Sequence, residues 1–242
     1  MLDRKNFYIN GKWVSPSEPK NYKVIDPSNE ETCAEISLGG KKDIDKAVSA
    51  AKKAFETWAF SKKEERLDLL EKLYVVYKKR WSEMAKLISL EMGAPMKFST
   101  EMQAATGASH IKSFKNILKD FKFEKNLGEE KNNQKLLYEP KGVCALITPW
   151  NWPINQVNLK VIPALASACT VVLKPSEIAP LSSMLLAEMI DEVKFPPGVF
   201  NLVNGDGAVT GDALTSHPDI NMISFTGSTR AGALISQNAA KD

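Results

Sequence analysis

Four short motifs in the second half of the chain carry residue types that suit a nucleotide-binding site. Each motif follows a short apolar run, and each offers a glycine turn, a lysine, a carboxylate or a carboxamide. Such groups can donate to phosphates or accept hydrogen bonds from ribose hydroxyls. The motifs are Thr148-Pro149-Trp150-Asn151-Trp152-Pro153, Lys174-Pro175-Ser176-Glu177, Asn204-Gly205-Asp206-Gly207 and Thr226-Gly227-Ser228-Thr229-Arg230-Ala231-Gly232.

The last motif begins a predicted helix directly after a predicted strand. Its glycines, Gly227 and Gly232, would let the backbone approach a pyrophosphate. The helix N-terminus would offer free N–H groups and the positive end of the helix dipole. The alternative is an ordinary strand-to-helix turn in which glycine only fits the geometry. The spacing Gly205-x-Gly207-x-x-x-Gly211 is one residue longer than the common dinucleotide fingerprint and indicates little by itself.

Lys174 and Glu177 form a second candidate pair. A carboxylate after such a strand commonly accepts hydrogen bonds from an adenosine ribose. A neighbouring lysine can donate to the same hydroxyls or neutralise a phosphate. The alternative is a helix start in which Ser176 is the N-cap and Glu177 is an acidic residue of the first turn.

Asn151 lies between two tryptophans, just before Pro153. Proline favours the first position of a helix, so Asn151 either caps that helix or points its amide at a ligand. An amide N–H aimed at a developing oxyanion contributes a factor of about 10²–10³ in rate. The residues alone favour the cap.

A regular alternation of strands and helices must position these motifs. The apolar runs GVCALIT, TVVLKP, GVFNLVNG and INMISFTG predict four strands, separated by predicted helices at 153–167, 180–193, 206–216 and 228–240. This alternation predicts an α/β fold: a doubly wound, Rossmann-like parallel sheet over 142–242 with helices on both faces. Because ligands bind beyond the carboxyl ends of such strands, we expect all four motifs to converge on one edge.

The first 121 residues are expected to pack on this segment as strands followed by helices. FYINGKWV predicts a hairpin around Asn10-Gly11. Helical periodicity extends from about residue 43 to 121, with a capping box at Ser61 and Glu64 and a C′ glycine at Gly93. A long last helix is expected over 97–121.

Residues 122–141 are polar and charged. They are either a solvated loop or a hairpin whose tip lies between Asn126 and Asn133.

Composition excludes several classes. The 242 residues are 43% hydrophobic and 25% charged, which fits a globular protein with a sizeable core. A net charge of +3 does not favour nucleic acid or a membrane surface. No apolar run approaches the length of a membrane span, and the N-terminus leads into no apolar segment, so we expect no secretory signal. Three cysteines and two distant histidines argue against a disulfide framework or a metal site, so we expect a cytoplasmic protein.

In this order, the signatures ITPWNWP, TVVLKPSE, PPGVFNLVNGDG and SFTGSTRAG resemble the aldehyde dehydrogenase superfamily. FYINGKWV and AAKKAFETW resemble the family's N-terminal strands and first helix, so the resemblance covers the whole chain. It implies oxidation of an aldehyde to a carboxylic acid with NAD or NADP, in a homo-oligomer whose interface includes a hairpin starting in 122–141. Glu177 would favour NAD, because a carboxylate repels a 2′-phosphate.

The resemblance also implies roles for individual residues. Asn151 would donate to the oxyanion, and Lys160 would belong to a proton path. The implied cofactor-binding residues are Ile147, Thr148, Pro149 and Trp150 along the cofactor channel, Lys174 and Glu177 at the adenosine ribose, Gly207 and Gly211 at the adenine side, and Phe225, Thr226, Gly227, Ser228 and Gly232 at the pyrophosphate.

The chain departs from the family pattern in lacking the nucleophilic cysteine and the general-base glutamate of an ELGGK-type motif. Cys33, Cys144 and Cys169 do not match the nucleophile, and the latter two are expected to be buried thiols. We therefore expect the first half of an aldehyde dehydrogenase, truncated before the catalytic domain and inactive alone. The alternatives are a non-catalytic nucleotide-binding or interaction subunit and an inactive remnant. The apolar run INMISF is expected to form an open sheet edge, so that the chain self-associates.

Overall fold

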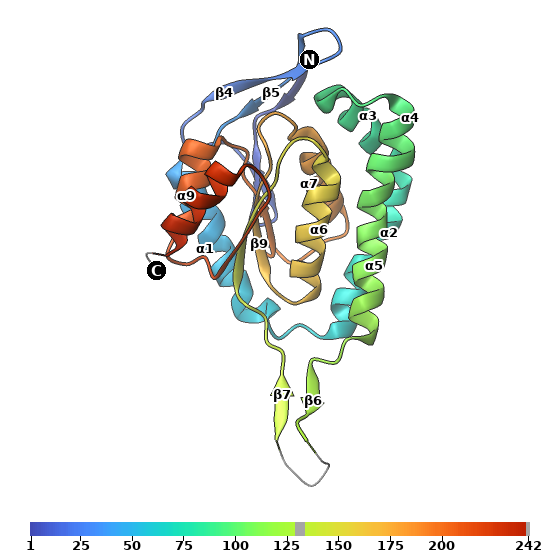
Figure 1. The fold of residues 1–242 in the computed structure, drawn as a ribbon, viewed down its shortest axis with the longest axis vertical. Coiled ribbons are helices and arrows are strands. Elements are labelled where there is room, and N and C mark those ends of the chain that lie inside the picture. Colours follow the sequence, from blue (N-terminus) through green and yellow to red (C-terminus); the bar gives the residue numbers. More distant parts are fainter. Residues whose placement is uncertain (129–133, 241–242) are drawn as a thin grey trace.

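The computed structural model describes residues 1–128 and 134–240 and is built around a six-stranded sheet (Figure 1). Its strands follow the order β11-β8-β9-β10-β2-β3. Four of these strands are parallel to one another: β8 (Val143–Ile147), β9 (Thr170–Lys174), β10 (Phe200–Leu202) and β11 (Met222–Phe225). The predicted α/β fold with a Rossmann-like parallel sheet is confirmed, and β11 lies at one edge of this sheet as expected.

The N-terminal hairpin extends the same sheet. Strands β2 (Phe7–Ile9) and β3 (Lys12–Val14) flank Asn10 and Gly11, which both have positive φ, 53° and 73°. That conformation is the one a two-residue hairpin needs, and Asn-Gly adopts it readily. β2 pairs antiparallel with β10 through Tyr8 and Leu202, a contact the sequence analysis did not foresee.

A second, three-stranded sheet of order β1-β5-β4 lies beside the N-terminus. It comprises β1 (Leu2–Arg4), β4 (Asn21–Asp26) and β5 (Glu31–Ser37). β4 and β5 are the two strands expected around the turn at Asp26, and their pairing register shifts between Val24 and Ile25.

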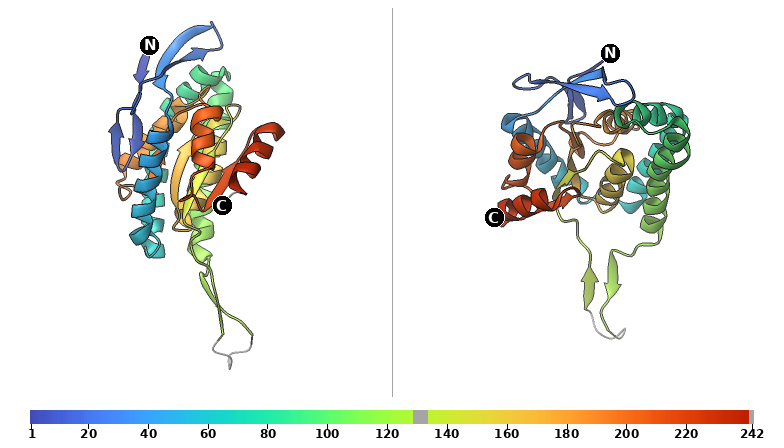
Figure 2. Two further views of the ribbon diagram at one scale, coloured as in Figure 1. Left: turned by 90° about the vertical axis from the view of Figure 1, so that its left-hand side faces the viewer. Right: turned by 45° about the horizontal axis from the view of Figure 1, so that its top comes forward.

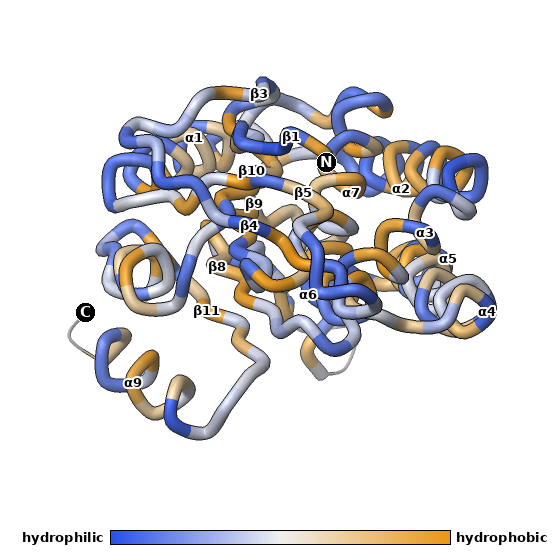
Figure 3. The backbone as a smooth tube through the Cα atoms, turned by 90° about the horizontal axis from the view of Figure 1, so that it is seen from above, coloured by the Kyte–Doolittle hydropathy of each residue, from blue (hydrophilic) through white to orange (hydrophobic). Residues whose placement is uncertain are grey.

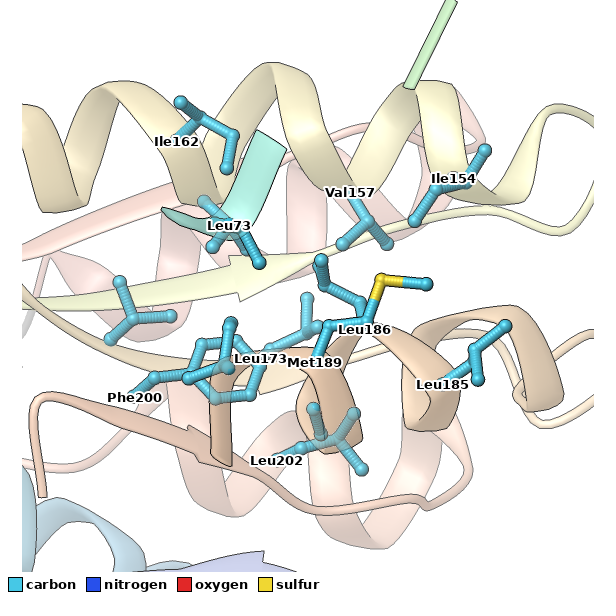
Figure 4. Packing of buried hydrophobic residues seen from close by; sticks show 14 of the residues in the cluster. Leu73, Ile154, Val157, Ile162, Leu173, Leu185, Leu186, Met189, Phe200 and Leu202 are labelled. Carbon is cyan, nitrogen blue, oxygen red and sulfur yellow. The ribbon is translucent and has the colours of Figure 1, made fainter. Parts of the chain in front are cut away.

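Helices cover both faces of the large sheet, as the alternation predicts (Figure 3). The sheet separates two hydrophobic cores, and successive residues of β8 belong to different ones. Ala145 packs with α1 (Lys41–Trp58), whereas Leu146 packs with the helices on the opposite face. The helices of that opposite face are α2 (Lys63–Lys79), α3 (Trp81–Met92), α5 (Ala104–Asp120), α6 (Pro153–Ala166) and α7 (Leu181–Glu192). Figure 4 shows part of this larger core, where Ile154 and Val157 of α6 lie over Leu173 and Phe200 of the sheet.

Two details of the helical region differ from expectation. The capping box at Ser61 does not form: α2 begins at Lys63 without a side-chain cap, and Ser61 Oγ instead accepts from Arg66. The long helix at 97–121 consists of α4 (Met96–Phe98), a π-helical turn η1 (Ser99–Gln103) and α5. Gly93 ends α3 with φ 74°, as a C′ glycine should.

The polar segment after α5 forms a projecting antiparallel pair, β6 (Glu124–Asn126) and β7 (Lys135–Leu137) (Figures 1 and 2). The hairpin alternative is therefore confirmed. Part of its expected tip, residues 129–133, lies outside the described residues.

Three helical elements follow the last two parallel strands of the chain. They are η2 (Gly207–Gly211) and α8 (Asp212–Thr215) after β10, and α9 (Thr229–Ala239) after β11. Within the described residues, no helix combines the length and apolarity that crossing a bilayer demands.

Candidate functional site

Three of the predicted cofactor-binding residues end neighbouring strands at the same edge of the sheet. In the strand register, Ile147 pairs with Lys174 on one side and with Phe225 on the other. The next backbone amides continue the ladder, because Thr148 N–H donates to Lys174 O (3.3 Å) and Thr226 N–H donates to Ile147 O (3.2 Å). The convergence expected of parallel strands is thus present at this edge.

A cleft of about 400 Å³ lies beyond this edge, between η2–α8 and α9. Its size is in the range of small-molecule pockets. Six predicted residues line it: Ile147, Lys174, Gly207, Gly211, Phe225 and Ser228. The other predicted cofactor-binding residues do not line it: Thr148, Pro149, Trp150, Glu177, Thr226, Gly227 and Gly232.

Further residues on the two helical walls also line the cleft and were not predicted from the sequence: Ala208, Asp212, Thr215, Arg230, Ala231, Leu234, Ile235 and Asn238. Their spacing could have revealed them. Positions three and four residues apart share a helix face, so Gly211 implies Thr215, and Ala231 implies Leu234, Ile235 and Asn238. The two walls also contact each other, since Asn238 Nδ2 donates to Asp212 Oδ1 (2.7 Å).

The glycines of this region serve two purposes. A side chain at Gly205 would overlap Thr210, and one at Gly227 would overlap the ring of Phe225, so packing alone requires glycine at both positions. At Gly207 a Cβ would meet nothing within 4 Å, and at Gly211 the nearest atom would be 3.5 Å away. The open space at Gly207 and Gly211 therefore belongs to the cleft.

Lys174 is held inside the protein at the floor of the cleft. Its ammonium donates to the carbonyl oxygens of Pro175 (3.0 Å) and Gly205, and the Glu177 carboxylate lies 3.6 Å away. Burial lowers the pKa of Lys174, and the nearby carboxylates of Glu177 and Asp206 oppose that change. Its contacts tie the end of β9 to the turn after β10.

The alternative reading of this motif as a helix start is wrong. α7 begins at Leu181, after Pro180, and Ser176 Oγ accepts only a local hydrogen bond from Ile178 N–H (3.3 Å). Glu177 is therefore not a first-turn residue, and its side chain remains partly exposed beside Lys174.

The first turn of α9 lines the cleft through Ser228, Arg230 and Ala231. Ser228 is its N-cap, and its Oγ accepts from Ala231 N–H (3.2 Å). Asp206 caps η2 in the same way, accepting from Val209 N–H (2.7 Å). Both caps leave backbone N–H groups of the first turns available to an acceptor.

Asn151 is exposed in the loop between β8 and α6. It is not the helix cap that the residues alone favoured, because Trp152 takes the N-cap position without any side-chain hydrogen bond. Trp152 is instead fixed edge-on against Phe98, with ring centroids 5.4 Å apart. This contact fixes the Trp152 ring next to Asn151, which is exposed.

Lys160 lies more than two turns further along α6. Its ammonium donates to Ser224 Oγ (3.0 Å), and burial lowers its pKa. The cysteines lie elsewhere: Cys144 and Cys169 are buried at the amino-terminal ends of β8 and β9, away from the cleft, and Cys33 is half-buried in β5. The expectation of buried thiols at Cys144 and Cys169 is confirmed. Within the described residues, no three His, Cys, Asp or Glu side chains are grouped to hold a metal ion.

A profile of the aldehyde dehydrogenase family matches residues 13–242. A curated 3-succinoylsemialdehyde-pyridine dehydrogenase from Pseudomonas sp is 49% identical over 99% of this chain and 50% of its own length. A solved aldehyde dehydrogenase from Bartonella henselae superposes with a TM-score of 0.97 at 59% identity, covering 100% of this chain and 51% of that one.

A mutant of aldehyde dehydrogenase C from Pseudomonas syringae, solved in complex with NAD+ and octanal, gives a TM-score of 0.95 at 45% identity, covering 98% of this chain and 48% of its own. The chain thus spans about half the length of the relatives it matches.

Proposed function

The chain belongs to the aldehyde dehydrogenase family, and from this we propose that it forms the NAD-binding half of an enzyme that oxidises an aldehyde to a carboxylic acid. The observation that carries the proposal is the cleft between η2–α8 and α9, at the carboxyl ends of three parallel strands. Dinucleotides bind at this edge of open parallel sheets.

The residues of the cleft fit one half of a dinucleotide. Gly207 and Gly211 leave space on one wall, and Leu234 and Ile235 make the other wall apolar enough for an adenine ring. The first turn of α9 offers backbone N–H groups to a pyrophosphate. Lys174 and Glu177 would hold the adenosine ribose, with Lys174 already fixed by backbone carbonyls.

Asn151 would act on the substrate itself. Its amide would donate to the aldehyde oxygen as negative charge develops there, which lowers the barrier to attack on the carbonyl carbon. Bound NAD would supply the oxidising power by accepting two electrons from the substrate. Lys160, whose pKa is lowered by burial, would pass a proton between α6 and Ser224 of β11.

The attacking thiol would not come from Cys33, Cys144 or Cys169. Two of these are buried at the end of the sheet that lies opposite Asn151, and the third lies in the N-terminal sheet. We therefore propose that the chain alone does not oxidise aldehydes. We further propose a cytoplasmic location and assembly with copies of itself through the projecting β6–β7 hairpin, which carries exposed Leu136 and Leu137.

Calorimetric titration of the chain with NAD tests the cofactor proposal. Gly207→Leu should fill the cleft and weaken NAD binding at least about tenfold, because its side chain would occupy the adenosine space. Ala233→Leu is the matched control, since Ala233 is exposed on α9 and does not line the cleft. Equal NAD affinity in the wild type and Gly207→Leu would exclude this cleft as the cofactor site.

A further inference from the structure

A second cavity lies on the N-terminal side of the molecule. It has a volume of about 670 Å³, and its wall includes residues of β1 and β3, which lie close to the N-terminus in Figure 3, together with residues of β5 and α7. Within the described residues, none of those that line it also lines the cofactor cleft. Its volume is in the range of small-molecule pockets, and the proposed function leaves it without a role.

The charged side chains at this cavity are already paired within the protein. Arg4 Nη1 donates to Glu188, which also accepts from Arg80 Nη2 (2.6 Å). The Lys5 ammonium lies 2.6 Å from a carboxylate oxygen of Glu35. A charged ligand or a zwitterion would have to compete with these pairs. The charges on the wall also cancel, because two are positive and two are negative: Arg4, Lys5, Asp3 and Glu188. The cavity therefore favours a neutral polar ligand.

The same wall keeps hydrogen-bonding capacity for such a ligand. A guanidinium has five N–H donors and a carboxylate has about four acceptor positions, so the contact between Arg4 and Glu188 leaves both with groups to offer. Asn6 and Asn21, both exposed, add amide donors and acceptors. Hydroxyl groups donate and accept, so they match a wall that does both. This composition points to a ligand rich in hydroxyls.

Ser37 adds a buried hydroxyl to the wall of the cavity. It is the last residue of β5 and is 1% exposed, and its Oγ has no hydrogen-bond partner within the described residues. A buried hydroxyl without a partner lowers the stability of the folded state. A ligand hydroxyl in the cavity would supply the missing partner.

Trp13 gives the cavity a flat apolar surface. Tyr8 holds the indole edge-on, with ring centroids 5.3 Å apart, and the Tyr8 hydroxyl donates to Asp191 Oδ1 (3.2 Å). Pro16 and Pro19, which lack a backbone N–H, also line the cavity. A large, rigid aromatic ring can pack against the C–H face of a sugar ring while the hydroxyls at the sugar's edge reach polar groups.

We propose that this cavity binds a neutral sugar, with one pyranose ring packed on Trp13 and its hydroxyls bonded to the Arg4–Glu188 pair and to Ser37. An acyclic polyol lacks the flat C–H face, and a charged sugar would disturb the ion pairs. The inference does not depend on the proposed function, because the cavity and the cofactor cleft have no lining residue in common within the described part of the chain.

Ligand-observed NMR titration of the chain with methyl β-glucoside tests the proposal. This glycoside has no free aldehyde, so it neither resembles the proposed substrate nor reacts with lysines. Sorbitol has a comparable set of hydroxyls without the ring, and methyl β-glucuronide keeps the ring but adds a carboxylate. We expect methyl β-glucoside to bind at least about fivefold more tightly than either comparison ligand, a ratio of the size of one hydrogen bond.

Ser37→Ala should weaken the binding of methyl β-glucoside about fivefold. It should not lower the midpoint of thermal unfolding, because the lost hydroxyl has no partner in the described part of the protein. Ser183→Ala is the matched control, since Ser183 Oγ is also buried without a partner among the described residues but does not line the cavity. Trp13→Leu should abolish the preference for the glycoside over sorbitol, and Trp13→Phe should retain part of it.

Four results would each overturn the inference: no binding of methyl β-glucoside at about 50 mM, equal binding of sorbitol, tighter binding of methyl β-glucuronide, or undiminished binding by Ser37→Ala. A titration with NAD, with and without saturating glycoside, keeps the two sites apart. The NAD affinity should be the same in both titrations. Displacement of NAD by the glycoside would place the sugar in the cofactor cleft and contradict the proposal, whereas a failure of NAD to bind would contradict only the proposed function.

Discussion

The carboxylate of Glu177, partly exposed 3.6 Å from the Lys174 ammonium, carries the expectation that NAD is preferred to NADP. A 2′-phosphate placed there would meet like charge, worth about 1 kcal/mol at a solvated site. We predict that NAD binds this chain more tightly than NADP, and that Glu177→Gln raises the NADP affinity about fivefold while changing NAD affinity little. Calorimetric titration with both cofactors measures the ratio of the NAD affinity to the NADP affinity. Glu192→Gln, an exposed change at the end of α7, should leave it unchanged; tighter binding of NADP to the wild type would contradict the prediction.

Glu91 is a buried carboxyl group whose ionisation we expect to affect stability. It is fully buried at the end of α3, and its carboxylate accepts from the backbone N–H groups of Leu181 and Ser182 (3.1 Å) at the start of α7. Burial raises its pKa to about 7, although these hydrogen bonds favour the ionised form. The folded state therefore holds a proton that the unfolded chain releases at lower pH. The stabilisation is complete below the unfolded pKa and is lost as pH rises toward 7.

We predict that the free energy of unfolding of the wild type, relative to Glu91→Gln, falls by about 3 kcal/mol between pH 4.5 and pH 8. Glutamine keeps an acceptor for the amides and cannot ionise. Urea unfolding at several pH values measures the difference. The free energy of unfolding of Glu56→Gln, a change on the exposed face of α1, should vary with pH as that of the wild type does. The same pH dependence in Glu91→Gln and the wild type would disprove the prediction.

At the scale of elements, the junction of α2, α5 and α6 depends on Gly107. A Cβ there would overlap the hydroxyl of Tyr77 and lie 3.1 Å from Cγ1 of Ile154. Tyr77 is fully buried and donates to Ala104 O (2.9 Å). Alanine favours a helix by about 1 kcal/mol over glycine, but overpacking costs more. We predict that Gly107→Ala destabilises the protein by about 2 kcal/mol.

A double-mutant cycle tests whether overlap with the Tyr77 hydroxyl causes the destabilisation by Gly107→Ala. Tyr77→Phe removes the hydroxyl, so Gly107→Ala should cost less in that background than in the wild type. Gly207→Ala is the control for alanine substitution itself, because a Cβ at Gly207 meets no atom within 4 Å. The free energy of unfolding is the measurement, and additive effects of Gly107→Ala and Tyr77→Phe would rule out the clash.

At the scale of the whole molecule, β11 leaves one edge of the large sheet uncovered within the described residues. Met222 of β11 and Leu234 of α9 are about half exposed. An apolar strand edge pairs readily with other chains, and a charged side chain on the edge opposes that pairing. We predict that the chain, of 26.8 kDa, elutes above its monomer mass and that Met222→Lys shifts it toward the monomer. Light scattering after size exclusion measures the mass.

The control for this prediction is Phe60→Lys. Phe60 is 85% exposed just after α1, far from β11 in the chain, so its replacement should leave association unchanged. A monomeric wild type, or an equal response to both substitutions, would show that β11 does not drive association.

Much of the fold could be predicted from local patterns. Asn10-Gly11 has the residue types of a tight hairpin turn, and the alternation of apolar runs with helical periodicity indicated a parallel sheet with helices on both faces. Two helix caps were predicted wrongly. Ser61 has the spacing of a capping box, yet its hydroxyl accepts a hydrogen bond from Arg66. Asn151 had the position of a cap and is not one.

Turn chemistry and periodicity act over a few neighbouring residues, and for that reason the sequence by itself determined most of the elements and their order. The alternation of strands and helices also predicted that the ends of β8, β9 and β11 share one sheet edge. Tertiary structure alone decided the contacts between distant segments. It placed β2 beside β10, Glu91 under the start of α7, and His110 against Asn155. Each of these contacts depends on how whole elements pack, because a hydrogen bond or a clash forms only when packing brings both groups within a few ångströms.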